Sequence, residues 1–312
     1  MTCSVSTREH QLHFLFPFRI AHGVRLTTAA LRVYLHCGSF ISEGEATFPP
    51  YLPETAATAN DFIHKVSWDL YLPGMDPRDF YPQIKNTASG NYFAKAALDM
   101  ALWNAFPAKN DCFPKATCQP LSFYTLAVCT NKEMSLRFQQ GIQHGFRCFK
   151  IKLDGKNDHE MIENFRKISD HAFAVDANSS WTSVEQGMEM ADFLHSHGCM
   201  FIEQPFSPGK NHWSEELKHR NILPVIADES LQTESDLEEV EACFNGGNIK
   251  LLKCGGLTPA IPLAEKMKER GMKILIGCMS ESKIGCDAAA LLAGYADWLD
   301  LDGPYLTREE NF

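Results

Sequence analysis

The sequence lacks the marks of several common protein classes. The formal net charge is −10 and the basic residues form no stripe, so we expect neither a nucleic-acid partner nor an anionic membrane surface. No apolar run is long enough to span a membrane, and the first residues, MTCSVSTREHQLHF, contain no continuous apolar segment like that of a signal peptide. The eleven cysteines include no CxxC pair, which argues against a zinc site and a disulfide framework. We therefore expect free thiols and a cytoplasmic location.

What remains is an ordinary globular composition. Of the 312 residues, 45% are hydrophobic and 22% are charged, which is enough core material for one large or two smaller domains. The oligomeric state stays open, a homo-oligomer included.

Residues 1–117 read as an α+β domain. Strand-like runs such as QLHFLFPFRI and AALRVYLHCGSF come first, and helical spacing follows in ETAATANDFIHKVSWDLYL and NYFAKAALDMALWNAF.

Residues 118–312 alternate between short apolar runs and amphipathic, charge-rich segments. The eight apolar runs are LSFYTLAV, RCFKIKL, AFAVDAN, MFIEQPF, LPVIADES, IKLLKCGG, KILIGCM and DWLDLDG. Strand–helix alternation is typical of the α/β class, and eight strands fit a closed (β/α)8-type (TIM) barrel. A doubly wound open sheet is the alternative, but no GxGxxG motif follows the first strand.

The run FKIKLD, residues 149–154, places two lysines in one predicted strand. Because side chains alternate across a strand, Lys150 and Lys152 face one way, while Phe149, Ile151 and Leu153 face the other. The apolar set is the one that a packed helix would cover. The two lysines then face either open water or an enclosed site.

Polar residues stand at the predicted C-terminal ends of the other strands, where barrel enzymes place their active sites. Along the chain they are Asp176, Asn178, Glu203, Asp228, Glu229 and Lys253. Taken alone, each carboxylate also reads as a helix N-cap or a solvated loop residue. Taken together, carboxylates follow three consecutive strands, and lysines bracket them on the second and sixth strands, which are opposed in an eight-stranded barrel. The parity of IKLLK places Ile249, Leu251 and Lys253 on one face of the sixth strand.

Three carboxylates without a neighbouring His or Cys suit a hard divalent ion that keeps positions open for water and substrate oxygens, and Mg²⁺ is the natural choice. Such an ion can bind a substrate carboxylate and stabilise the enediolate that forms when the α-proton leaves. A lysine on one face removes this proton, and a lysine on the other face returns one. The pattern therefore predicts racemisation or epimerisation at a carbon next to a carboxylate.

These residues resemble the enolase superfamily, and within it the muconate-lactonizing subgroup. The resemblance rests on the K-x-K of FKIKLD, on the carboxylates in VDANSSW, IEQPF and ADES, and on the lysine of KCGG. GEATFPPYLPET and AKAALDMAL resemble the N-terminal capping domain of this family, so the resemblance covers almost the whole chain. It implies a modified TIM barrel with an α+β cap. The chain departs from the family pattern by stopping ten residues after Asp302, whereas relatives usually run on to pack against the cap.

The motif DLDG at the last strand narrows the subgroup. Asp300 and Asp302 form a D-x-D that is similar to the signature of dipeptide epimerases, in which the pair binds the free α-ammonium of the dipeptide. A desolvated ammonium needs such acceptors and charge compensation. The simpler reading is a capped turn, since DG is a common turn dipeptide. The segment GCMSESKIGCDAAA also resembles the seventh strand and the following helix of this subgroup.

The resemblance assigns a role to each of these positions. It implies that Lys152 and Lys253 are the acid/base pair and that Lys150 neutralises the metal-bound carboxylate and lowers the pKa of the neighbouring lysine. The implied metal ligands are Asp176, Glu203 and Asp228, with Asn178 and Glu229 beside them as supporting groups. The implied substrate is a dipeptide of the Ala–Glu type or a related one, epimerised at its C-terminal residue.

Specificity in this family comes from the capping loop after the first strand, here residues 19–27, and from the ends of the last two strands. Arg25 or His22 could meet an acidic C-terminal side chain, as in Ala–Glu from cell-wall peptides, and solvated loop residues are the simpler reading. An o-succinylbenzoate synthase or a muconate cycloisomerase would use the same ligands and lysines, but neither substrate has an ammonium for the D-x-D. A non-catalytic barrel would be expected to have lost at least one lysine or carboxylate.

Overall fold

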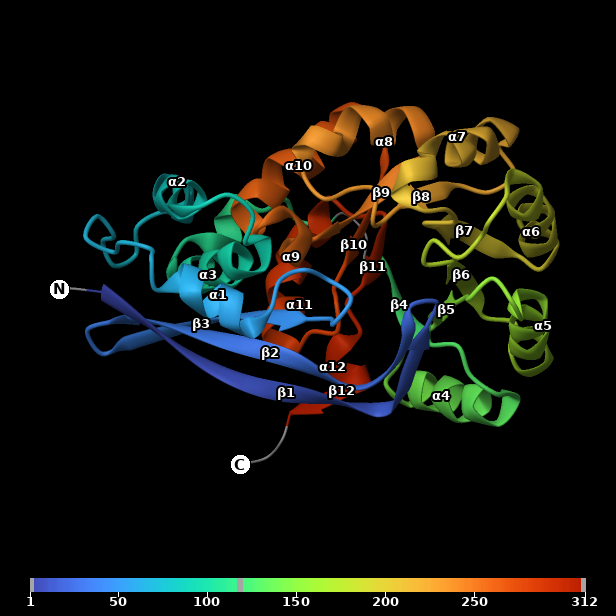
Figure 1. Cartoon of the computed structure of the whole chain (residues 1–312), viewed down its shortest axis with the longest axis horizontal. Coiled ribbons are helices and arrows are strands. Elements are labelled where there is room, and N and C mark those ends of the chain that lie inside the picture. Colours follow the sequence, from blue (N-terminus) through green and yellow to red (C-terminus); the bar gives the residue numbers. More distant parts are fainter. Residues whose placement is uncertain (1–2, 117–119, 310–312) are drawn as a thin grey trace.

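The computed structural model describes residues 3–116 and 120–309. Figure 1 shows a barrel with helices around it and, beside it, a smaller part built mainly from the N-terminal strands and helices, which we call the cap. The eight barrel strands close in the order β10-β11-β4-β5-β6-β7-β8-β9. The predicted α/β barrel with an N-terminal α+β part is therefore confirmed.

The cap is built on an antiparallel sheet in the order β12-β1-β2-β3. Its strands are β1 (Cys3–Ile20), β2 (Gly23–Cys37), β3 (Phe40–Phe48) and β12 (Thr307–Glu309), the last from the far end of the described chain. Strands β1 and β2 form a long hairpin whose tip reaches the barrel near β4 and β5 (Figure 1). Residues 19–27, expected as a loop, are this tip. Gly23, with φ of +129°, lets the chain reverse there within two residues.

Three helices of the cap are α1 (Ala56–Ile63), α2 (Pro77–Thr87) and α3 (Tyr92–Ala105), followed by the 3-10 turn η1 (Lys109–Cys112). The helical prediction after Glu54 was too long, because α1 ends at Ile63. Helix α2 was not predicted, although Asp76 caps it and Pro77 stands at its first position, which are helix-start signals.

All eight predicted barrel strands are present. They are β4 (Leu121–Leu126), β5 (Cys148–Lys152), β6 (Ala172–Asp176), β7 (Cys199–Glu203), β8 (Val225–Ala227), β9 (Gly246–Lys250), β10 (Lys273–Gly277) and β11 (Trp298–Asp300). Their connections carry α4 (Asn131–Gln143), α5 (Asp158–Ile168), α6 (Val184–Ser196), η2 (Pro208–Lys210), α7 (Asn211–Arg220), η3 (Glu234–Asp236), α8 (Leu237–Cys243), α9 (Leu251–Cys254), α10 (Leu257–Glu269), α11 (Lys283–Ala290), η4 (Leu291–Gly294) and α12 (Gly303–Leu306).

Strand parity divides the barrel core into an inner and an outer part. Phe149 and Ile151 belong to the outer core, which the helices cover, as the sequence predicted. At the closed end, the interior is filled by a separate apolar cluster of Phe123, Cys148, Ala174, Phe201, Ile226 and Leu275. Because this plug shuts one end, the polar residues of the strand ends lie above it, at the end that the cap faces.

One strand prediction was wrong. The sixth barrel strand ends at Lys250, and the following residues turn into the short helix α9. Ile249 therefore packs in the outer core, and Lys253 stands on the helical turn rather than on the strand. A short apolar run cannot by itself be told from a buried helical turn, which explains the error.

The cysteine prediction needs a second correction. Cys3 and Cys37 form a disulfide between the paired ends of β1 and β2. The cross-strand register, which the sequence does not show, brings them together. The other described cysteines are free thiols, while Cys118 lies outside the described residues.

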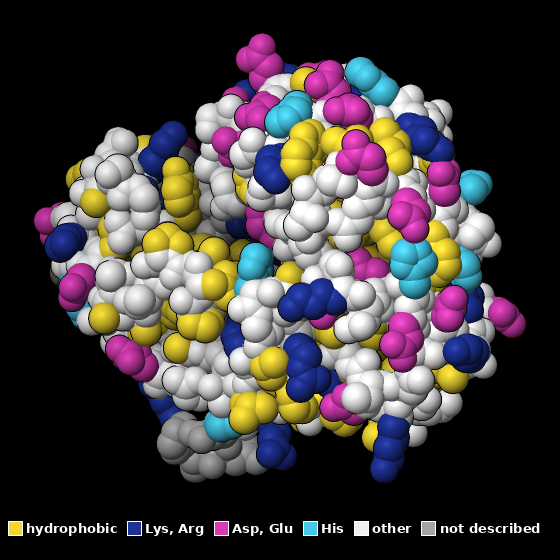
Figure 2. Space-filling view, turned by 45° about the vertical axis from the view of Figure 1, so that its right-hand side comes forward, with side chains coloured by type: hydrophobic (Ala, Val, Ile, Leu, Met, Phe, Trp, Pro, Cys, Tyr) yellow, Lys and Arg dark blue, Asp and Glu magenta, His cyan; other side chains and the backbone are white. Residues whose placement is uncertain are grey.

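Figure 2 shows one face of the molecule, on which acidic and basic side chains are interspersed over the barrel. This face carries no basic stripe, in agreement with the sequence. Within residues 3–116 and 120–309, no helix is long and apolar enough to cross a bilayer.

Buried polar contacts join the cap to the barrel. The Asp99 carboxylate on α3 accepts hydrogen bonds from the Thr258 backbone N–H (2.8 Å) and hydroxyl (2.7 Å) near the start of α10. On the other side, Glu45 on β3 accepts a hydrogen bond from the Ser282 backbone N–H (2.8 Å) at the start of α11. These contacts hold the cap over the open end of the barrel.

The cap packing generates a stability prediction. A Cβ atom at Gly44 on β3 would lie 1.9 Å from the Ala97 carbonyl oxygen of α3, so the helix would have to move. We expect Gly44→Ala to lower the free energy of unfolding by about 1–3 kcal/mol, measured as a lower Tm. Gly209→Ala is the matched control, because nothing lies within 4 Å of that position. Equal Tm values for the two variants would contradict the packing argument.

Candidate active site

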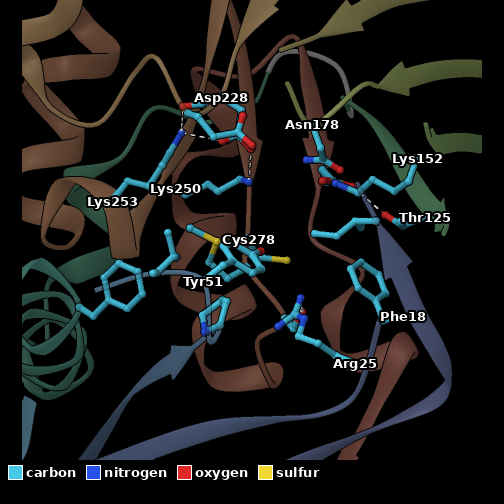
Figure 3. A pocket seen from close by; sticks show the side chains of 18 of the residues that line it. Phe18, Arg25, Tyr51, Thr125, Lys152, Asn178, Asp228, Lys250, Lys253 and Cys278 are labelled. Carbon is cyan, nitrogen blue, oxygen red and sulfur yellow. Dashed lines mark hydrogen bonds and ion pairs between the residues drawn. The ribbon is translucent and has the colours of Figure 1, made fainter. Parts of the chain in front are cut away.

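A cavity of about 200 Å³ lies at the open end of the barrel under the cap. It is lined from the barrel by Thr125, Lys152, Asn178, Asp228, Glu229, Gln232, Lys250, Lys253, Cys278, Met279, Ser280, Asp300 and Asp302. The hairpin tip contributes Phe18, Ile20 and Arg25, and the cap loop contributes Tyr51 and Glu54. Figure 3 shows Lys152 on one side of this cavity and Lys250, Lys253 and Asp228 on the other.

The two lysines of FKIKLD face the enclosed site, as one of the two sequence readings required. Lys150 is 1% exposed and Lys152 is 8% exposed. The Lys152 ammonium donates to the Asp176 carboxylate, and the Lys150 ammonium donates to Glu203 Oε2 at 3.0 Å. Parity on β5 therefore positions both ammonium groups among carboxylates of the neighbouring strands.

The three predicted ligand carboxylates come together. Asp176 ends β6, Glu203 ends β7, and Asp228 follows β8 by one residue. All three are buried, and one oxygen from each lies within 4.8 Å of the others. A set of carboxylate oxygens without His or Cys fits a hard divalent cation. The residues present thus fit the predicted metal site.

Each of these carboxylates has its own set of partners. The Asn178 backbone N–H donates to Asp176 Oδ1 at 2.9 Å. Asp228 Oδ2 accepts from the Lys250 ammonium at 2.6 Å, and Asp228 Oδ1 accepts from the Lys253 ammonium at 2.7 Å. Such contacts fix the directions in which the oxygens point, because buried polar groups must be hydrogen-bonded.

The protonation of the site follows from these contacts. Burial alone would raise the pKa of Asp228, but Lys250 and Lys253 hold it well below its usual range. Burial, then Asp228 and Asp176, raise the pKa of Glu229 to about 8. Burial also lowers the pKa of Lys253 from its ordinary value, with Asp228 opposing the shift. The site therefore holds carboxyl groups in different charge states side by side.

The D-x-D pair lies at another wall of the cavity. Asp300 pairs with the Lys150 ammonium, and Asp302 accepts a hydrogen bond from the Thr125 backbone N–H. Burial, then the neighbouring Asp300, raises the pKa of Asp302 to about 7. Both carboxylates are buried, so the D-x-D is part of the site and not an exposed turn. A cationic group entering here would relieve their mutual repulsion.

Arg25 reaches the cavity from the hairpin tip. Its guanidinium carbon lies 5.3–5.5 Å from the ring centroids of Phe14, Phe18 and Tyr51, which form an aromatic enclosure around it. It donates to the Ser280 hydroxyl at 3.3 Å, and no ion pair to a carboxylate is recorded for it within residues 3–116 and 120–309. Burial lowers its pKa from the ordinary value. His22 is exposed beside Tyr51 and is not part of the lining.

Two predicted supporting residues line the cavity, and each has one side-chain oxygen without a partner among the described residues. The Oδ1 atom of Asn178 and the Oε2 atom of Glu229 are buried and lack a hydrogen bond there. Asn178 has φ of +44°, which costs energy for a residue other than glycine. Unpaired oxygens beside the carboxylate cluster suit a cation, its water or a substrate group.

Sequence reasoning missed two inward residues of β9. Lys250 is 6% exposed and lies across the barrel from Lys152 (Figure 3), and Asn248 is fully buried. Lys250 is the last residue of its strand, as Lys152, Asp176 and Glu203 are of theirs. Parity counted from Ile249 as an outer-core residue could have found both, but the same letters were read as a longer strand that ended at Lys253.

Comparison with known proteins adds to this geometry. The profile of the enolase C-terminal domain-like family matches residues 133–298. An L-Ala-D/L-amino acid epimerase of Maribacter sp. is 34% identical, over 98% of this chain and 91% of the relative. An L-Ala-D/L-Glu epimerase of Bacteroides thetaiotaomicron is 30% identical, over 97% and 80%. A solved dipeptide epimerase of Methylococcus capsulatus, complexed with Mg and L-Arg-D-Lys, is similar with a TM-score of 0.82 and 26% identity, over 98% of this chain and 92% of that one.

The carboxylate cluster generates a metal-binding prediction. Adding Mg²⁺ or Mn²⁺ to the chelated protein should raise its Tm, because a ligand that binds the folded state at a hundred times its Kd adds about 2.7 kcal/mol. Asp228→Asn should reduce this gain strongly, whereas Glu189→Gln, on an exposed carboxylate of α6, should keep it. A protein whose Tm ignores both metals, with no metal found by elemental analysis, would rule out the site.

Proposed function

This chain belongs to the dipeptide epimerase family of the enolase superfamily, and on that premise we propose that it inverts the α-carbon of the C-terminal residue of a dipeptide. The observation that carries the proposal is the placement of buried ammonium groups on opposed strands, Lys152 at the end of β5 and Lys250 at the end of β9, with the carboxylate cluster between them. A carbon held between two such groups can lose a proton to one and gain a proton from the other.

Binding of the dipeptide can be derived from the charges that line the cavity. Asp300 and Asp302 would receive its α-ammonium, since two buried carboxylates offer acceptors and opposite charge. The Lys150 ammonium would face the substrate carboxylate from the side of Glu203. This places the reacting α-carbon toward Lys152 on one side and β9 on the other.

Mg²⁺, held by Asp176, Glu203 and Asp228, would supply positive charge for the substrate carboxylate as the α-proton leaves. The apolar plug below and the cap above limit the access of water to the cavity, which strengthens the charge interactions of its buried groups.

Two lysines compete for the role of the second base. The Lys253 ammonium donates to three protein acceptors: the carbonyl oxygen of Asp228 (2.6 Å), its Oδ1 (2.7 Å) and the carbonyl oxygen of Asn248 (2.8 Å). An ammonium has three protons, so none is left for a substrate. Lys250 uses one proton, on Asp228 Oδ2. We therefore propose Lys152 and Lys250 as the acid/base pair, in place of the Lys152 and Lys253 pair expected from the sequence.

The enclosure of Arg25 supports an acidic side chain at the C-terminal residue of the substrate. A partly buried guanidinium that pairs with no carboxylate of the described residues has lost hydration that a substrate carboxylate would replace. Dipeptides of the Ala–Glu type would provide that group. This preference is tested by exchanging a dipeptide library in D2O and reading deuterium at each α-carbon by mass spectrometry.

The rival activities, o-succinylbenzoate synthase and muconate cycloisomerase, leave the D-x-D without a cation to bind, which argues against both.

The cellular location and the oligomeric state stay predictions. The eight described free thiols favour the cytoplasm and the Cys3–Cys37 disulfide does not. A homo-oligomer also stays open.

The lysine assignment predicts which reactions each variant keeps. Lys152→Ala and Lys250→Ala should both lose epimerisation, since inversion needs a donor opposite the base. Each should still exchange the α-proton of one epimer in D2O, and the two variants should differ in which epimer that is. Each lost step should be slower by about 10²–10⁴-fold.

Lys253→Ala separates the two assignments. If Lys253 acts through Asp228, exchange should slow for both epimers alike. If Lys253 is the base, its variant should lose exchange from one epimer, and Lys250→Ala should slow both. A Lys152 or Lys250 variant that epimerises in both directions at the parental rate would refute the opposed pair.

The ammonium subsite gives a further prediction. Asp302→Asn should raise KM for a free dipeptide much more than it lowers Tm, because it removes negative charge from the buried carboxylates that would receive the substrate ammonium. An N-acetylated dipeptide should be a poor substrate for the parent enzyme. Equal turnover of acetylated and free dipeptides would exclude the dipeptide assignment.

A further inference from the structure

Asn248 is a buried amide that contacts the carboxylate cluster through Glu203, and no step of the reaction above uses it. It lies on β9, two residues before Lys250, and its side chain is fully buried inside the barrel. Its Nδ2 atom donates to Glu203 Oε1 at 2.7 Å. The other oxygen of Glu203 accepts from Lys150 at 3.0 Å, so both carboxylate oxygens are held by named donors.

The orientation of this amide is dictated by Glu203. A carboxylate only accepts hydrogen bonds, so the NH2 group must face it and the amide oxygen must face away. Asn248 Oδ1 then has no hydrogen-bond partner among the described residues. It lies against Gly277 of β10, where a Cβ atom would come within 2.4 Å of Oδ1. The barrel leaves room for the amide but gives its oxygen no donor.

An unpaired buried polar group costs about 1–3 kcal/mol. Leucine is of similar size and would fill this place without that cost. The amide therefore has a role that the packing of the barrel does not explain. The contact that only the amide provides is the one to Glu203.

The backbone of Asn248 is also linked, through the Lys253 ammonium, to Asp228, the ligand that follows β8. The Asn248 carbonyl oxygen accepts from Lys253 at 2.8 Å, and the same ammonium binds the carbonyl oxygen and Oδ1 of Asp228. The recorded β8–β9 pairing extends to Ala227 and Gly247, one residue before Asp228 and Asn248. Lys253 thus bridges two carbonyl groups where the ladder stops. These contacts fix the position of Asn248 relative to Asp228. The Asn248 amide can therefore fix the direction of the Glu203 carboxylate relative to Asp228.

We propose that Asn248 is a positioning residue for cation binding: its amide sets the direction of Glu203, and thereby the spacing between Glu203 and Asp228. The inference rests on the proposed metal site and goes beyond it, because it assigns a function to a residue that is not itself a ligand. Partners that orient metal ligands typically contribute about 10- to 100-fold to metal affinity.

The test compares Asn248→Leu with Asn245→Leu. Asn245 precedes the same strand at its other end, and its side chain accepts a hydrogen bond from the Val225 backbone N–H at 2.8 Å, far from the carboxylates along β9. Each change removes one side-chain amide contact to a neighbouring strand: the buried contact to Glu203 of β7 for Asn248, and the half-buried contact to Val225 of β8 for Asn245. Mg²⁺ or Mn²⁺ affinity is measured by titration calorimetry on the metal-free proteins, so no dipeptide is needed. We expect Kd to rise about 10- to 100-fold for Asn248→Leu and to stay within about threefold for Asn245→Leu.

The rise in Tm on metal binding is a second measurement, and it remains informative if a variant is less stable than the parent protein. The rise in Tm on adding saturating metal should shrink for the Asn248 variant and persist for the Asn245 variant, whatever their metal-free Tm values. Asn248→Ala serves the same purpose if leucine does not fit beside Gly277. Parental Kd in a folded Asn248 variant, or an equal loss in the Asn245 variant, would overturn the proposal. A parent that binds metal but exchanges no dipeptide α-proton would refute the proposed reaction and leave this inference standing.

Discussion

The rest of the site depends on charge compensation at the open end of the barrel. Four buried ammonium groups, Lys150, Lys152, Lys250 and Lys253, share this space with six carboxyl groups, Asp176, Glu203, Asp228, Glu229, Asp300 and Asp302. Burial and the neighbouring carboxylates raise the pKa of Glu229 to about 8 and that of Asp302 to about 7, so these two groups hold a proton more readily than ordinary carboxyl groups do. A divalent cation would balance the excess of negative charge. Binding of such a cation would then be linked to proton release, as for any site whose ligands or neighbours must ionise.

The sequence was sufficient for the architecture and for most of the site, for a physical reason. Strand–helix alternation and the parity of residues 149–153 depend on local periodicity, which needs no knowledge of distant contacts. The ends of β6, β7 and β8 then follow from counting along each strand, and the structure brings their carboxylates together. Local patterns failed where tertiary contacts decide. The turn that ends β9 at Lys250 is set by packing under the cap, and the Cys3–Cys37 pairing is set by the register of two strands.

The barrel and the cap contribute different residues to the cavity. Barrel residues at strand ends are rigidly placed by the ladder, which suits groups that must hold a cation and move a proton over a short distance. The residues that would meet the substrate side chain, Arg25 and Tyr51 among them, come from the hairpin tip and a cap loop. The tip of a hairpin and a surface loop tolerate substitution better than the barrel strands do, because fewer buried contacts depend on them. A change of substrate would therefore require few changes in the barrel.

The short strand β12 gives the cap sheet a member from the opposite end of the chain. After β11, the barrel chain makes only the four-residue α12 before Thr307 joins β1, opposite Phe14. The cap sheet thus combines three strands that precede the barrel with one that follows it, so the whole barrel is an insertion between its strands. During synthesis the sheet cannot be completed until the barrel has been made, so its last edge closes late. A single cut between β3 and β4 would therefore leave β12, a strand of the cap sheet, attached to the barrel.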